Sequence, residues 1–221
     1  MRHPAVPYIA PFLTFLAVMA IEKATGLPVA WMYPLRALAT LAVLLAVSRA
    51  PLGKRPARPL MSVVLGAVVF ALWIGPDVVF GPGYRHFWLF ENSINGAAVS
   101  SIPMALRNSY WFLALRTASC ALLVPPVEEL FWRGWAMRWL IDSDFEKVAL
   151  GTYRTAAFWI VALLFAAEHG PYWEVGLVTG IVYNWWMVKT RNVTDCIIAH
   201  AVTNGLLSAY ILATHQFHYW L

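Results

Sequence analysis

The chain has 221 residues, of which 61% are hydrophobic and only 12% are charged, and its mean hydropathy is +0.63. A soluble domain of this size does not need so much apolar surface, so we predict a single integral membrane domain over residues 1–221. The net charge of +5 is interpreted as basic loops that set the topology and contact anionic lipid. No nucleic-acid partner is therefore expected.

Long apolar runs predict an all-α, multi-pass membrane bundle of about eight transmembrane helices. The expected helices, in chain order, cover residues 8–21, 32–47, 60–74, 108–124, 126–141, 155–169, 173–188 and 193–213. Residues 84–106 mix charged, polar and aromatic side chains, and this pattern leaves open an interfacial helix or a further crossing. We expect the protein to be integral to a membrane.

The segment 49–59 holds four basic residues and three prolines, which predicts a cytoplasmic loop. If residues 84–106 do not cross, Lys189 and Arg191 fall outside, against the positive-inside rule. If they do cross, both residues fall inside and the polar residues described next face outward. The sequence leaves both arrangements open.

Two adjacent carboxylates, Glu128 and Glu129, interrupt this apolar sequence together with Arg133. A charge near the centre of a membrane helix costs roughly 2.5–3.5 kcal/mol, so such residues usually face a cavity or one another. Pro125 and Pro126 are expected to end one helix and open the next. On that helix Glu129 and Arg133 are four residues apart and can pair. Glu128 is turned about 100° away and is left without such a partner.

Further polar side chains occur in the later apolar helices. His169 follows Glu168 at a predicted helix end, and His200 and Asn204 share one helical face four residues apart. The two histidines suit a ligand pair, a proton shuttle or oxyanion donors. Because each buried polar group carries a desolvation cost, we expect these residues, with Glu128, Glu129 and Arg133, to share one cavity.

The three motifs Glu128-Glu129-x-x-x-Arg133, Phe165-x-x-x-His169 and His200-x-x-x-Asn204 occur in this order on successive predicted helices. Together they resemble the CAAX protease and bacteriocin-processing (CPBP) family of intramembrane proteases, which includes the Rce1-type prenyl protease. The resemblance covers a catalytic core at about residues 108–213. The chain is also similar in general character to bacterial CAAX-protease-related proteins found beside exosortase sorting systems. This similarity implies a location in a bacterial inner or plasma membrane.

The resemblance implies an intramembrane endopeptidase that hydrolyses a peptide bond with a water activated by Glu128. It also implies that His169 holds this water and that His200 and Asn204 donate to the oxyanion. Amide hydrolysis needs a base, a bound water and such donors, so the residue types agree with these roles. The implied partners are membrane lipid and a peptide or protein substrate that is lipidated or carries a sorting tail.

Glu129 and Arg133, by the same resemblance, support the site. Glu168 is outside the family motif, and as the helical neighbour of His169 it is expected to point elsewhere, at an interface or in a loop. Asn184 and Trp185 on the next predicted helix either line the cavity or bond between helices.

Several alternatives stay open. No cofactor is favoured, but zinc held by Glu128, His169 and His200 is an alternative, since two histidines and a glutamate form a known catalytic ligand set. A non-catalytic membrane scaffold or immunity protein on the same fold is a second functional class. The third is a proton or solute transporter that uses the same three residues as a relay.

Overall fold

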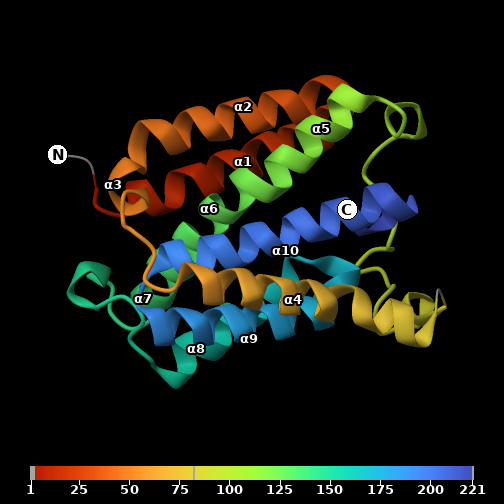
Figure 1. Ribbon diagram of the computed structural model, residues 1–221. Coiled ribbons are helices and arrows are strands. Elements are labelled where there is room, and N and C mark those ends of the chain that lie inside the picture. The colour runs from red at the N-terminus through yellow and green to blue at the C-terminus, as the bar shows by residue number, and fades with distance from the viewer. Residues whose placement is uncertain (1–2, 82, 221) are drawn as a thin grey trace.

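The computed structural model describes residues 3–81 and 83–220, shown in Figure 1. Those residues form helices joined by turns and loops, without a β-strand, so the predicted all-α class is confirmed. The α-helices are α1 (Val6–Thr25), α2 (Val29–Val47), α3 (Arg49–Leu52), α4 (Pro59–Phe80), α5 (Tyr110–Ala118), α6 (Val124–Glu129), α7 (Met137–Trp139), α8 (Thr155–Ala167), α9 (Trp173–Thr190) and α10 (Val193–Thr214).

Five helices in the described part of the chain are long and apolar enough to cross a membrane. Four of them are α1, α2, α4 and α10, and the fifth is a continuous helix over Tyr110–Trp139. The helix α8 is apolar but shorter. The molecule is therefore a helical bundle with several membrane-spanning elements.

The helix Tyr110–Trp139, here called the composite helix, contains α5, α6 and α7 joined by π-helical segments at Ser119–Leu123 and Leu130–Ala136. The expected break at Pro125 and Pro126 is wrong, because the chain continues through both prolines without leaving the helix. In the first π-helical segment the Val124 N–H donates to the Ser119 carbonyl, five residues earlier. This wider turn accommodates residues that lack an N–H, whereas proline in a regular α-turn clashes with the carbonyl four residues before it.

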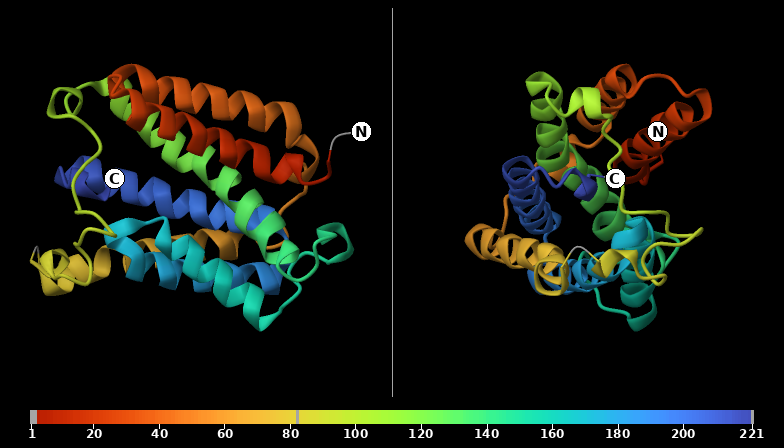
Figure 2. Two further views of the ribbon diagram at one scale, coloured as in Figure 1. Left: turned by 180° about the vertical axis from the view of Figure 1, so that it is seen from behind. Right: turned by 90° about the vertical axis from the view of Figure 1, so that its right-hand side faces the viewer.

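The composite helix runs diagonally between two groups of helices (Figures 1 and 2). The hairpin of α1 and α2 lies on one side, and α4, α8 and α9 lie on the other, with α10 between them (Figure 2). Along α4 and α10 the backbones approach closely, since a Cβ added at Gly66 would lie 2.8 Å from Cβ of Val202. The Thr203 hydroxyl, in the same crossing, donates to the Gly66 carbonyl at 2.8 Å. Gly66 therefore fixes the position of the helix that carries His200 and Asn204.

One end of the bundle, here called the basic end, gathers the loops 49–58 and 142–154 and the turn between α9 and α10. Buried Asp195 accepts hydrogen bonds from the backbone N–H groups of Ala57 and Arg58, each at 2.9 Å. The Asn192 amide donates to the Arg55 carbonyl at 2.7 Å. These contacts place the following basic residues at one end: Arg49, Lys54, Arg55, Arg58, Arg138, Lys147, Arg154, Lys189 and Arg191.

Residues 83–109 form a loop with short 3-10 turns at the opposite end, here called the loop end. This segment is neither an interfacial helix nor a crossing. Arg85 pins it to the bundle through ion pairs with Asp77 at 2.9 Å and Glu174 at 2.6 Å. Because residues 110–139 make one crossing instead of two, Lys189 and Arg191 return to the basic end although the loop does not cross. The conflict between charge and topology in the sequence arises from the misplaced break.

Candidate active site

Four of the side chains singled out in the sequence line one cavity of about 290 Å³: Glu128, His169, His200 and Asn204. Glu128 comes from α6, His169 from the turn after α8, and the other two from α10. Among the described residues, no group hydrogen-bonds to the buried Oε2 atom of Glu128. The carboxylate of Glu128 therefore faces the cavity, and its Oε2 atom makes no structural hydrogen bond to the described residues.

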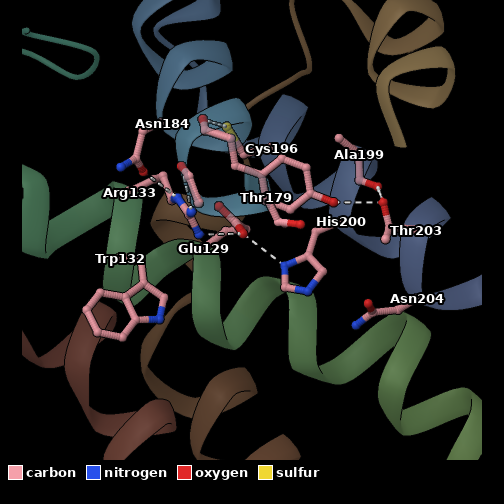
Figure 3. A network of polar contacts seen from close by, with 12 residues as sticks. Glu129, Trp132, Arg133, Thr179, Asn184, Cys196, Ala199, His200, Thr203 and Asn204 are labelled. Carbon is pink, nitrogen blue, oxygen red and sulfur yellow. Dashed lines mark hydrogen bonds and ion pairs between the residues drawn. The ribbon is translucent and has the colours of Figure 1, made fainter. Parts of the chain in front are cut away.

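Glu129 lies behind the cavity wall and is fully buried. Its Oε1 atom accepts from the Arg133 guanidinium at 3.0 Å and from Nδ1 of His200 at 2.9 Å (Figure 3). The pairing expected from the four-residue spacing is present, and the structure adds the histidine as a second donor. Since Nδ1 of His200 faces a carboxylate, Nε2 is the nitrogen left for the cavity.

Arg133 is also fully buried and uses each nitrogen for a different partner. Its Nε donates to Oδ1 of Asn184 at 3.0 Å, and another nitrogen reaches the Gly180 carbonyl at 3.5 Å. The Asn184 amide in turn donates to the Phe158 carbonyl at 2.8 Å. Asn184 therefore bonds between helices, which is one of the two roles left open by the sequence. Arg133 joins the composite helix to α9 beneath the cavity.

His169 is oriented by its own backbone turn. Its Nδ1 lies 2.6 Å from the Phe165 carbonyl, which can only accept, so Nδ1 carries the hydrogen. The ring packs against Phe165 at 4.7 Å and Trp73 at 5.4 Å between centroids. A Cβ added at Gly176 would lie 3.2 Å from the His169 side chain, so glycine at that position leaves room for the ring. In its neutral form this histidine presents the Nε2 lone pair.

Asn204 is held at the cavity by the irregular part of the composite helix. Its amide donates to the Cys120 carbonyl at 2.9 Å. In the π-helical register the partner of this carbonyl would be the N–H of Pro125, which does not exist. Pro125 therefore leaves the Cys120 carbonyl without a backbone donor, and one amide hydrogen of Asn204 bonds to it. The second amide hydrogen of Asn204 remains for another acceptor.

Glu168 lines the same cavity, so the expectation that it points elsewhere is wrong. The helix α8 ends at Ala167, and the rule that neighbouring residues diverge by about 100° no longer applies at positions 168 and 169. The indole N–H of Trp132 donates to Oε1 of Glu168 at 3.1 Å. A second carboxylate thus lies near Glu128, fixed by a tryptophan of the composite helix.

Zinc held by Glu128, His169 and His200 is the alternative that the sequence left open. Among residues 3–81 and 83–220, no three histidine, cysteine, aspartate or glutamate side chains are arranged to hold a metal ion. Nδ1 of His200 contacts Glu129 and Nδ1 of His169 contacts a carbonyl, so Nε2 of each ring is the nitrogen left for the cavity. Cys120 and Cys196 are free thiols. The expectation that the reaction needs no metal stays a prediction.

Residues 109–206 match the model of the family described as type II CAAX prenyl endopeptidase Rce1-like. This segment is similar to that family. It contains all three motifs, from Glu128 to Asn204, so the resemblance predicted from them is confirmed over the matched residues. No curated protein and no solved structure matches the chain.

The matched segment contains the candidate site and is similar to a protease family, which supports peptidase activity on a peptide or protein substrate. With five long apolar helices, the chain is a multi-pass integral membrane protein. The narrower similarity to exosortase-associated proteins and the bacterial membrane stay predictions.

Proposed function

We propose that this protein is an intramembrane endopeptidase in which Glu128 activates the attacking water. The observation that carries the proposal is a buried carboxylate oxygen without a hydrogen-bond partner among the described residues, facing a cavity that two histidines and an asparagine also line. A general base must reach the proton that it takes, and an uncommitted oxygen meets that need. The catalytic core is assigned to residues 108–213 within a single domain.

The proposed reaction uses the free atoms of each side chain. Glu128 takes a proton from water while the Nε2 lone pair of His169 accepts the other O–H. The water oxygen then bonds to the carbonyl carbon, and the tetrahedral oxyanion is stabilised by donors aimed at it. We assign these donors to the second amide hydrogen of Asn204 and to Nε2–H of His200, which exists when the ring is an imidazolium. Glu128 returns its proton to the nitrogen as the C–N bond breaks.

Glu129 and Arg133 act behind these groups. The carboxylate of Glu129 accepts from Nδ1 of His200 and so fixes the orientation of the ring. Arg133 balances the charge of Glu129 and connects it to α9. The site therefore has its own cation beside the carboxylates, and an added dication would leave it with excess positive charge unless both carboxylates bound it.

The test is cleavage of a mixture of synthetic peptides by the purified protein, followed by mass spectrometry, with and without a chelator. The substitution Glu128→Gln keeps the size of the side chain and removes the base, so turnover should fall by about a hundredfold or more. Folding and membrane yield should stay normal, because Oε2 of Glu128 makes no hydrogen bond to other described residues. Chelation should leave cleavage unchanged.

The matched control is Glu168→Gln, since Glu168 is a second carboxylate that lines the same cavity. Glutamine retains an oxygen for the Trp132 indole, so we expect this variant to keep measurable cleavage. Turnover by Glu128→Gln at the wild-type rate would refute the assignment of the base. A stoichiometric zinc content lost in His169→Ala, together with sensitivity to the chelator, would make the protein a metalloprotease. Failure of the wild-type protein to cleave any peptide would favour the scaffold or the transporter.

A further inference from the structure

Three polar side chains of α10 line the cavity at intervals of four residues: His200, Asn204 and Ser208. Positions that are four residues apart lie on the same face of a helix. The proposed reaction uses His200 and Asn204, which are assigned to the oxyanion. It leaves Ser208, one turn further along the same face, without a role.

The hydroxyl of Ser208 is buried, with the residue 1% exposed, and it has no hydrogen-bond partner among the described residues. Serine and threonine within a helix can bond to the carbonyl four residues earlier. On the same helix the Thr203 hydroxyl does so with Ala199 at 3.1 Å. The Thr214 hydroxyl does so with Tyr210 at 2.7 Å. Because an unpaired buried hydroxyl is costly, Ser208 is suited to a partner that enters the cavity.

A peptide that is cut in this cavity brings such partners in its backbone. A carbonyl within an α-helix is bonded to the N–H four residues later, so the peptide must unwind around the bond that is cut. The freed carbonyls then need donors from the protein, since an apolar cavity offers little water. Phe12, Leu16, Val124 and Leu207 line the cavity and supply no side-chain donor. The few polar side chains of the wall must therefore bind the backbone.

The spacing along α10 matches that of an extended peptide. Four residues of α-helix rise by about 6 Å. Two residues of extended chain cover about 6.6 Å, after which the carbonyl points in the same direction again. A peptide whose scissile carbonyl lies at Asn204 therefore presents the carbonyl two residues away to Ser208. Rotation about the Cα–Cβ bond of Ser208 can turn its hydroxyl toward that carbonyl.

We propose that the substrate lies as an extended strand along α10, and that Ser208 donates a hydrogen bond to the main-chain carbonyl two residues from the scissile one. Ser208 then selects the conformation of the substrate and not its side chains. A segment that stays helical at this point offers no free carbonyl and is not bound. The inference rests on the proposed endopeptidase function, because Asn204 at the oxyanion sets the register of the strand.

The first experiment measures binding, so that it is independent of the chemistry. The Glu128→Gln protein in phosphatidylcholine nanodiscs is titrated with a fluorescein-labelled Ala/Leu octapeptide, and fluorescence anisotropy is the readout. Adding Ser208→Ala should weaken binding by about fivefold, as expected for one neutral hydrogen bond. Ser208→Thr retains the hydroxyl and should retain binding.

The matched control is Thr40→Val. The Thr40 hydroxyl is also fully buried and has no partner among the described residues, but Thr40 belongs to α2 and does not line the cavity. This variant should bind the peptide as tightly as the parent protein does. Unfolding temperatures are measured for every variant, and Ser208→Ala should not lower them, because it breaks no hydrogen bond to the described residues.

The second experiment uses a peptide that the wild-type protein cleaves at one bond. Ser208→Ala should raise KM by about fivefold and leave kcat nearly unchanged, because the contact is present before and during the reaction. Replacing one amide by an ester weakens the carbonyl as an acceptor. An ester at one of the two positions that lie two residues from the scissile carbonyl should weaken binding to the parent protein and have no further effect in Ser208→Ala.

Equal binding by the parent and Ser208→Ala proteins, or no binding by the parent, would overturn the contact. Weaker binding with a lowered unfolding temperature would make Ser208 a structural residue and also overturn it. Cleavage that is unaffected by Ser208→Ala would refute the contact and leave the proposed function standing. Binding that depends on Ser208 in a protein that cleaves nothing would do the reverse.

Discussion

At the residue scale, the two adjacent carboxylates of the first motif have different surroundings because of helix geometry. Oε1 of Glu129 accepts from both Arg133 and His200, whereas Glu128 lines the cavity. The Oε2 atom of each carboxylate has no hydrogen-bond partner among the described residues. Glu129 therefore orients a histidine as well as balancing an arginine. We expect its loss to affect the fold and the site together.

The substitutions Glu129→Ala and Arg133→Ala should each lower stability more than Glu128→Ala does. Each change leaves a buried charge without its partner, at a cost of about 3–5 kcal/mol. Both side chains are fully buried, so solvent does not compensate. The measurement is the unfolding temperature of the purified variants in one detergent. A lower unfolding temperature for Glu128→Ala than for the other two would contradict the structural role.

Arg133→Lys provides the control for charge alone. Lysine keeps the cation but cannot place three nitrogens on Glu129, Asn184 and Gly180 at once. We therefore expect Arg133→Lys to be destabilised as well, though less than Arg133→Ala. Wild-type stability of the lysine variant would show that charge, and not the arrangement of hydrogen bonds, holds the site.

The spacing of Glu129 and Arg133 within one helical turn predicted their ion pair. The cost of burying polar groups predicted that Glu128, His169, His200 and Asn204 share one cavity, although they lie on different helices. The individual contact of Glu129 with His200 was not predicted, because no spacing in the sequence relates two helices whose separation is set by packing. Glu168 was misplaced because the helical rule was applied beyond the last helical residue, Ala167.

At the scale of elements, the site depends on how α10 is seated against α4 and the composite helix. The break expected at Pro125 could not be excluded from sequence, because a π-helical turn leaves no simple pattern of residues. The close approach of α4 and α10 at Gly66 could not be predicted from sequence either, since many glycines in membrane helices lie at no such crossing. In this protein the two features set the depth and rotation of His200 and Asn204.

Gly66→Ala tests the crossing of α4 and α10. The new Cβ would meet the Ala199 carbonyl oxygen and would lie 2.8 Å from Cβ of Val202. Overpacking of this kind costs about 1–3 kcal/mol, and it should also lower cleavage by displacing His200. Unfolding temperature and turnover are measured on the same preparation.

The matched control for this change is Gly75→Ala on the same helix. An added Cβ there has no atom within 4 Å, so this variant should be neutral or slightly more stable. Equal unfolding temperatures for the two alanine variants would show that the crossing tolerates a wider separation.

At the scale of the whole molecule, the basic residues of the loops gather at one end of the bundle, while the cavity is lined partly from the loop end, by Trp220, Tyr219 and Tyr172. By the positive-inside rule the basic end is cytoplasmic. The cavity should therefore open to the non-cytoplasmic side. The sequence offered both orientations, and the single crossing of residues 110–139 now makes the charge distribution consistent with one.

The native thiols allow this orientation to be measured. Cys120 lines the cavity, whereas Cys196 is fully buried. A membrane-impermeant maleimide should label Cys120 in right-side-out vesicles and not in inverted ones, and Cys120→Ser should abolish the labelling. On the Cys120→Ser background, Lys23→Cys should follow the pattern of Cys120, and Lys54→Cys should show the reverse. If Lys23→Cys is labelled only in inverted vesicles and Lys54→Cys only in right-side-out vesicles, the cavity opens to the cytoplasmic side.

The length of the composite helix has a consequence for the membrane around the protein. Its 30 residues correspond to about 45 Å, whereas the hydrocarbon core of a bilayer is about 30 Å thick. A diagonal course, as in Figure 2, reconciles the two lengths, and a thinner bilayer demands a larger tilt from the membrane normal. Glu128 is part of this helix, so its depth below the surface changes with the tilt. Lipid acyl-chain length should therefore set the depth in the bilayer at which a peptide bond meets Glu128.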